Sequence, residues 1–71
     1  MIQTYLHKLG KNIKDIRKSK KLSQEKLAEL VGKSRNYVGM IEKGETNIPT
    51  ITLLEIAKAL NVHPKIFFDF K

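Results

Sequence analysis

The sequence predicts an all-α fold, a compact domain of five helices that spans residues 1–71. Apolar residues recur at spacings of three and four in several separate segments, as they do on the buried face of an amphipathic helix. In the middle of the chain, serines that suit helix starts alternate with glycines that suit helix ends. Because 71 residues without cysteine are near the lower limit for a stable core, we expect a partner subunit to help.

The first helix is predicted from about Thr4 to Lys18. Its lysines lie on the side away from one apolar stripe, formed by Leu6, Leu9, Ile13 and Ile16.

Residues 23–44 predict two short helices joined by a tight turn. Ser23 is placed to cap the first of them, and Gly32 to end it in a left-handed conformation. Ser34 and Gly44 do the same for the second helix. The expected buried residues are Leu27, Leu30 and Val31 in the first helix and Val38 and Ile41 in the second. This layout is typical of a helix-turn-helix, whose second helix enters the major groove of DNA.

A fourth helix is expected to open near Thr50, with an apolar face of Leu53, Ile56, Ala57 and Leu60. His63-Pro64 then starts a last short helix, because proline suits the first helical position. In this segment we expect Phe67 and Phe68 to close the core and Ile66 and Phe70 to lie at the surface.

The charge of the chain favours a polyanionic partner. Fourteen Lys and Arg against seven Asp and Glu give a net charge of +7. Seven of the basic residues fall between positions 8 and 21, where Asp15 is the only acid. A solvated helix face without a partner is the ordinary explanation of such a stretch, but a neighbouring helix-turn-helix favours DNA. A cationic helix lying on anionic lipid is a weaker alternative, since only Tyr5 could anchor it.

From about Leu9 to Phe68 the chain resembles the phage-repressor and Cro type of regulator, with its lambda-repressor-like fold. The residues that carry the resemblance are Leu22-Ser23-Gln24-Glu25-Lys26-Leu27-Ala28, Ile41-Glu42-Lys43-Gly44 and Ile56-Ala57-Lys58-Ala59-Leu60. Arg35-Asn36-Tyr37-Val38, with Ile66-Phe67-Phe68, is similar to the controller proteins of restriction-modification systems. The resemblance implies a transcriptional regulator that binds a palindromic operator in double-stranded DNA as a homodimer. A Cro-like or antitoxin-type repressor, or a helix-turn-helix protein-interaction module, is the alternative.

The outward face of the second short helix is expected to read base edges. An arginine can donate two hydrogen bonds to guanine, and an asparagine can bond adenine in the same way. Arg35 and Asn36 are therefore the first candidates. Gly39 in mid-helix suggests close approach of DNA or of a neighbouring helix, and Met40 could touch a thymine methyl or simply fill a gap.

Contacts to the DNA backbone are expected around this helix. Gln24 follows the cap Ser23 at a helix start, where free N–H groups bind phosphate, and the resemblance implies an anchoring contact there. Tyr37 could send its hydroxyl to a phosphate or be a half-buried ring. The remaining candidates for backbone contact are Ser34, Lys43 and Asn47.

The resemblance also implies a partly buried ion pair between Arg17 and Glu42, where the alternative is two unrelated surface charges. A dimerisation segment is expected at about residues 54–70, with Leu54, Ile66 and Phe70 in the interface. Core filling alone is the other explanation of these aromatic and aliphatic residues.

Three residues depart from the family pattern. Lys21 stands where such proteins usually have glycine, so it must adopt a positive φ at about 1 kcal/mol, or the turn must differ locally. Lys33 replaces an apolar residue, and its stem can cover apolar surface. Pro49 stands where a capping Ser or Thr is common.

No catalytic constellation is visible. His7 and His63 lie far apart and suit a helix surface and a helix cap, so we expect no enzyme, no metal and no cofactor. The N-terminal residues are too polar for a signal peptide, and no apolar run approaches the roughly 20 residues of a membrane span, which predicts a cytoplasmic protein. Without a second domain, no small-molecule effector is expected.

Overall fold

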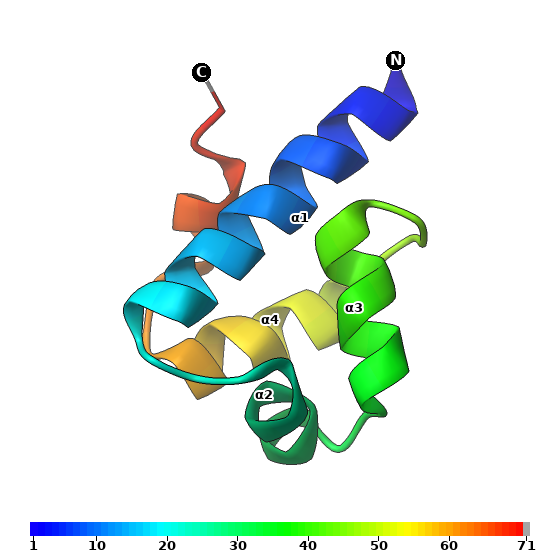
Figure 1. Cartoon of the computed structure of the whole chain (residues 1–71). Helices are drawn as coiled ribbons and strands as arrows, with labels where there is room; N and C mark the ends of the chain where they lie inside the picture. Colours follow the sequence, from blue (N-terminus) through cyan, green and yellow to red (C-terminus); the bar gives the residue numbers. More distant parts are fainter. Residues whose placement is uncertain (71) are drawn as a thin grey trace.

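The computed structural model describes residues 1–70, and these residues contain helices but no strand (Figure 1). The elements are α1 (Ile2–Ser19), α2 (Gln24–Val31), α3 (Arg35–Lys43), α4 (Thr50–Leu60) and the 3-10 helix η1 (Pro64–Phe68). The all-α prediction is confirmed. The last of the five helices is a 3-10 helix of five residues rather than an α-helix.

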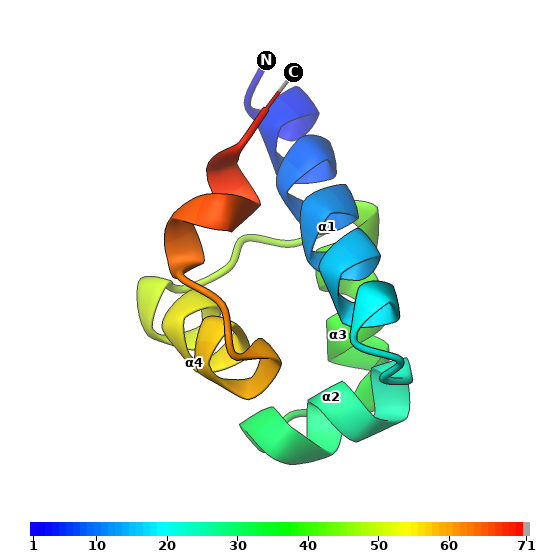
Figure 2. The same ribbon diagram turned by 90° about the vertical axis from the view of Figure 1, so that its left-hand side faces the viewer.

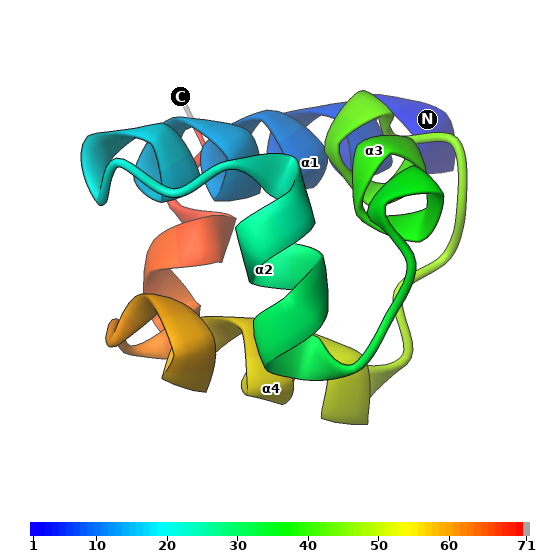
Figure 3. The same ribbon diagram turned by 60° about the horizontal axis from the view of Figure 1, so that its bottom comes forward.

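The helices enclose one core. α1 packs against α3 and η1, while α2 packs against α3 and α4. In Figure 3, α1 and α4 lie on opposite sides of the molecule and α2 runs between them. Figures 1 and 2 both show η1 beside the middle of α1. Every helix supplies at least one fully buried side chain, and α3 and α4 supply two each: Ile13, Leu27, Val38, Ile41, Ile56, Leu60 and Phe67.

The helix ends follow the local sequence. Gly32 and Gly44 adopt φ values of 67° and 72°, which is the left-handed conformation expected at the ends of α2 and α3. Lys21 adopts the strained positive φ of 60°, so the turn after α1 keeps its geometry without glycine. Asn61 ends α4 in the same conformation, which asparagine tolerates better than lysine. α4 begins at Thr50 although Pro49 offers no side-chain cap.

Two predictions about burial are wrong. Leu30 is 50% exposed, because the eight residues of α2 turn Leu27, Ala28 and Val31 toward the core and leave Leu30 at the side. Phe68 is 51% exposed, whereas Phe67 is fully buried. A 3-10 helix has three residues per turn, so consecutive side chains point about 120° apart and cannot share one core.

Phe70 was expected at the surface but is partly buried. The chain turns after η1 and brings the Phe70 ring to 5.7 Å from that of Tyr5 and 6.1 Å from that of Phe68, measured between centroids. Asn12 of α1 holds this turn, because its Nδ2 donates to the Phe67 carbonyl at 2.8 Å.

Candidate nucleic-acid interface

The two serines at the helix starts act as caps. The Ser23 hydroxyl accepts a hydrogen bond from the Lys26 N–H at 3.0 Å, and the Ser34 hydroxyl accepts one from the Tyr37 N–H, also at 3.0 Å. Each cap fixes where its helix begins. α2 and α3 are therefore joined by a turn of only three residues, Gly32 to Ser34.

The four candidates for base reading share one face of α3. Arg35 and Asn36 are exposed at the start of the helix, and Gly39 and Met40 are partly exposed one turn later. The Asn36 Nδ2 donates to the Met40 sulfur at 3.7 Å, a weak bond between neighbouring turns. These residues line a shallow hollow together with Gln24, Lys43 and Glu45. The structure thus brings together all four predicted base readers and two of the predicted backbone contacts.

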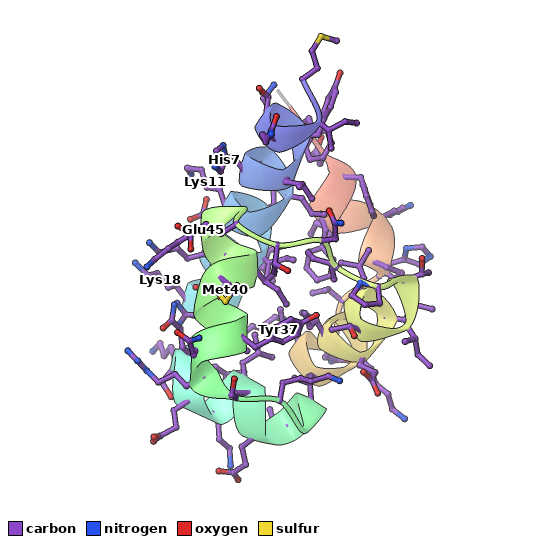
Figure 4. The ribbon with its side chains drawn as sticks, turned by 90° about the vertical axis from the view of Figure 1, so that its right-hand side faces the viewer. His7, Lys11, Lys18, Tyr37, Met40 and Glu45 are labelled. Carbon is purple, nitrogen blue, oxygen red and sulfur yellow. The ribbon has the colours of Figure 1, made fainter. Side chains whose placement is uncertain are left out.

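Glu45 is the member of this hollow that the sequence analysis did not single out. It follows the end of α3, and Figure 4 shows it on the same face as Met40. No periodicity marks a residue just beyond a helix, so only the length of α3 could have indicated its position.

Gly39 is not needed for helix packing. A Cβ built there would meet no backbone of a neighbouring helix, only the side-chain amide of Gln24 at the start of α2, at an ordinary van der Waals distance of 3.8 Å. Close approach of a neighbouring helix backbone therefore does not explain this glycine, and close approach of DNA stays a prediction.

Arg17 and Glu42 form a buried ion pair. The Arg17 Nε donates to Glu42 Oε2 at 2.6 Å, and its Nη2 donates to Oε1 at 3.1 Å. Both side chains are nearly inaccessible, with 7% and 2% of their surface exposed. The Arg17 Nη1 also donates to the Leu22 carbonyl at 2.6 Å, in the turn before α2. The pair fixes α1, α3 and the start of α2 relative to one another.

Gln24 belongs to the same network. Its Nε2 donates to Glu42 Oε1 at 2.9 Å, so the amide is held against α3 instead of pointing freely into solvent. The hollow beside Gly39 is therefore bounded by a side chain that is itself positioned by the ion pair.

The other predicted backbone contacts lie around this face. Lys43 and Asn47 are exposed, at the end of α3 and in the segment that follows it. Tyr37 is partly buried and packs against the core, on a different side of α3 from Met40 (Figure 4). Its ring takes the half-buried position that was one of its two expected roles.

Two glycines, one of which the sequence analysis missed, let α1 and α3 approach closely. A Cβ on Gly10 would lie 2.7 Å from the Glu42 carbonyl oxygen and still closer to that of Ile41. A Cβ on Gly44 would lie 2.7 Å from the His7 Cα. The signal for Gly10 was a glycine inside a helix, which costs about 1 kcal/mol relative to alanine and calls for a reason.

The three residues predicted for the dimer interface differ in exposure. Leu54 and Ile66 are 49% and 42% exposed, whereas Phe70 packs against Tyr5.

Within residues 1–70, no three His, Cys, Asp or Glu side chains gather as metal ligands would. Among the helices of the same residues, none is both long and apolar enough to cross a membrane.

The comparisons with known proteins agree with this geometry. The model of the helix-turn-helix family matches residues 13–67, which include α2, the turn and α3. The chain belongs to this helix-turn-helix family. Control protein C.SmaI of Serratia marcescens is 44% identical over 59 residues, covering 82% of this chain and 70% of that protein. Control protein C.BamHI of Bacillus amyloliquefaciens is 42% identical over 62 residues, covering 86% and 76%.

A solved structure extends the likeness to the fold. The crystal structure of the restriction-modification controller protein C.AhdI from Aeromonas hydrophila superimposes with a TM-score of 0.86 at 41% identity, covering 89% of this chain and 96% of that one. As a helix-turn-helix protein of this kind, the chain is a DNA-binding regulator of transcription.

Proposed function

We propose that the chain is the controller of a restriction-modification system and binds a palindromic operator in the cytoplasm as a homodimer, without a small-molecule effector. The observation that carries the DNA-reading part is the hollow on α3, where Arg35, Asn36, Gly39 and Met40 meet at the surface. The controller part is supported by the likeness to C.SmaI, C.BamHI and C.AhdI.

Base reading is assigned to the first two turns of α3. Arg35 donates two hydrogen bonds to guanine O6 and N7, and Asn36 pairs with adenine N6 and N7. Gly39 lets the helix backbone approach the groove, because only the Gln24 amide lies near the space a Cβ would take. Met40 offers an apolar surface to a thymine methyl.

Backbone contacts surround these four residues. Ser23, Gln24 and Ser34 present helix starts, where N–H groups and the helix dipole favour phosphate. Lys43 and Asn47 follow the helix, and the Tyr37 hydroxyl reaches a phosphate from the side of α3. The bond from Gln24 to Glu42 supports its role, because it holds the amide at a fixed place.

Arg35→Ala tests the base-reading assignment. A site is first selected by the wild-type protein from duplexes with a randomised segment, and both proteins are then titrated against that site and against a scrambled duplex at one salt concentration. We expect the affinity for the selected site to fall by about 1 to 3 kcal/mol and the affinity for the scrambled duplex to change little, because a bidentate guanine contact carries sequence information.

Lys58→Ala is the matched control, since it removes an exposed cation from α4, away from the hollow. It should leave both affinities unchanged. Equal losses on the two duplexes for Arg35→Ala would remove Arg35 from base reading. The controller part has a separate test in the neighbouring genes, where a methyltransferase and an endonuclease are expected.

A further inference from the structure

Three lysines of α1 form an exposed row beside the recognition helix. Lys11, Lys14 and Lys18, which we call the α1 lysine stripe, are spaced by three and four residues and therefore share one side of the helix. Figure 4 shows Lys11 projecting beside α3 near Glu45, and Lys18 projecting nearer to Met40. The stripe therefore runs along α3 on the face that carries the hollow.

The position of this stripe is fixed by packing. Gly10 abuts the backbone of α3, and Arg17 pairs with Glu42. Lys14 lies four residues after Gly10 and three before Arg17 and is exposed, so it leaves α1 at the edge of the side that packs against α3. Gly39 lies three residues before Glu42, so the two are neighbours on the surface of α3.

The stripe carries positive charge that the protein itself neutralises only at one end. The Lys11 Nζ donates to Asp15 Oδ2 at 2.7 Å, and within residues 1–70 Lys14 and Lys18 take part in no ion pair. The hydrogen bond from Lys11, and then the charges of Lys11, Lys18 and Lys14, hold the pKa of Asp15 below its ordinary value. Two free cations four residues apart repel one another, and a polyanion relieves that repulsion.

We propose that Lys14 and Lys18 bind DNA phosphates beside the half-site that α3 reads, so that α1 is a second DNA-contacting helix of this protein. The inference rests on the proposed function, because it places the duplex against α3. Each lysine that neutralises a phosphate releases a counterion, which makes its contribution measurable as salt dependence.

The test compares two double variants that each remove two charges. Lys14→Gln/Lys18→Gln should lower the slope of log K against log salt by about 1.8 units, or about 0.9 for each lost phosphate contact, on selected and scrambled duplexes alike. Lys8→Gln/Lys65→Gln is the control, since Lys65 lies in η1 and the Lys8 Nζ lies 6.0 Å from the centroid of the Tyr5 ring, on the other side of α1. Its slope should equal that of the wild type.

An unchanged slope for Lys14→Gln/Lys18→Gln, with circular dichroism showing a folded protein, would overturn the inference. An equal drop in both double variants would also overturn it, because net charge alone would then be the cause. An anionic lipid surface is the alternative partner, and co-sedimentation with phosphatidylserine vesicles tests it. If Lys14→Gln/Lys18→Gln loses vesicle binding but keeps the wild-type salt dependence of DNA binding, the stripe binds lipid and not DNA. A different result would contradict the proposed function: the wild-type protein would bind all duplexes equally well, and Arg35→Ala would not change this.

Discussion

Two mid-helix glycines show at the scale of single residues how one residue type serves two purposes. At Gly10 the space for a side chain is filled by the backbone of α3, whereas at Gly39 the space opens to the surface hollow. The sequence indicates that each glycine needs a reason, but only the packing partner distinguishes the reasons. For Lys21 the family resemblance implied either a positive φ or a locally different turn, and the φ of 60° shows which of the two occurs.

Gly10→Ala and Gly39→Ala should therefore affect stability with opposite sign. The first pushes a Cβ into the carbonyls of Ile41 and Glu42, which are backbone atoms that cannot swing away, and we expect it to lower the free energy of unfolding by about 1 to 3 kcal/mol. The second meets no backbone and gains up to about 1 kcal/mol of helix propensity. Urea denaturation measures both. A Gly10→Ala protein as stable as the wild type would contradict the close approach of α1 and α3.

At the scale of helices, the Arg17–Glu42–Gln24 network is the contact that holds three elements in one arrangement. It joins α1 to the end of α3 and to the start of α2. The family resemblance implied the ion pair, but the bond from Gln24 depends on a rotamer that no sequence pattern specifies. η1 was predicted from Pro64 onward, yet five residues give too little periodicity to tell a 3-10 helix from an α-helix.

Arg17→Met should cost more stability than any other loss of charge from α1. It leaves the Glu42 carboxylate buried without its cation, and we expect a loss of about 3 kcal/mol or more. Lys18→Met, at an exposed neighbouring position, is the control and should change stability by about 0.5 kcal/mol or less. Arg17→Met/Glu42→Leu should recover much of the loss, because the buried charge is then removed as well. If the denaturation midpoint of Arg17→Met equals that of Lys18→Met, the ion pair does not stabilise the fold.

For the whole molecule, helix boundaries could be predicted where they depend on residues close together in sequence. The wrong predictions concern burial, which depends on packing between distant segments. Serine caps and glycine ends mark α2 and α3 because the atoms that make a cap are close together in sequence. Leu30 and Phe68 were misplaced because their burial depends on how α2 and η1 are rotated against other elements. The four residues predicted as base readers do line one hollow on α3, whereas its neighbour Glu45 and the flank of α1 emerged only from the three-dimensional structure.

The dimer is the proposed feature on which operator recognition depends most. One recognition helix contacts only a few base pairs, so two-fold pairing is needed to double the contacts and to set the half-sites about 34 to 36 Å apart. Phe70 is partly buried against Tyr5, and replacing it would disturb the monomer as well as an interface. Leu54 and Ile66 are exposed, which makes them the cleaner pair for a test.

Leu54→Ser/Ile66→Ser should therefore give a folded monomer that binds DNA weakly and does not distinguish a palindrome from a single half-site. Both side chains are about half exposed in one chain, so their loss should cost little folding free energy but should remove the apolar centre of the interface. Leu30→Ser, at a 50% exposed position on α2, is the control and should stay dimeric. Sedimentation equilibrium with circular dichroism decides between the models: a folded double variant that remains dimeric places the interface elsewhere, and a monomeric wild-type protein that binds its palindrome tightly overturns the dimer.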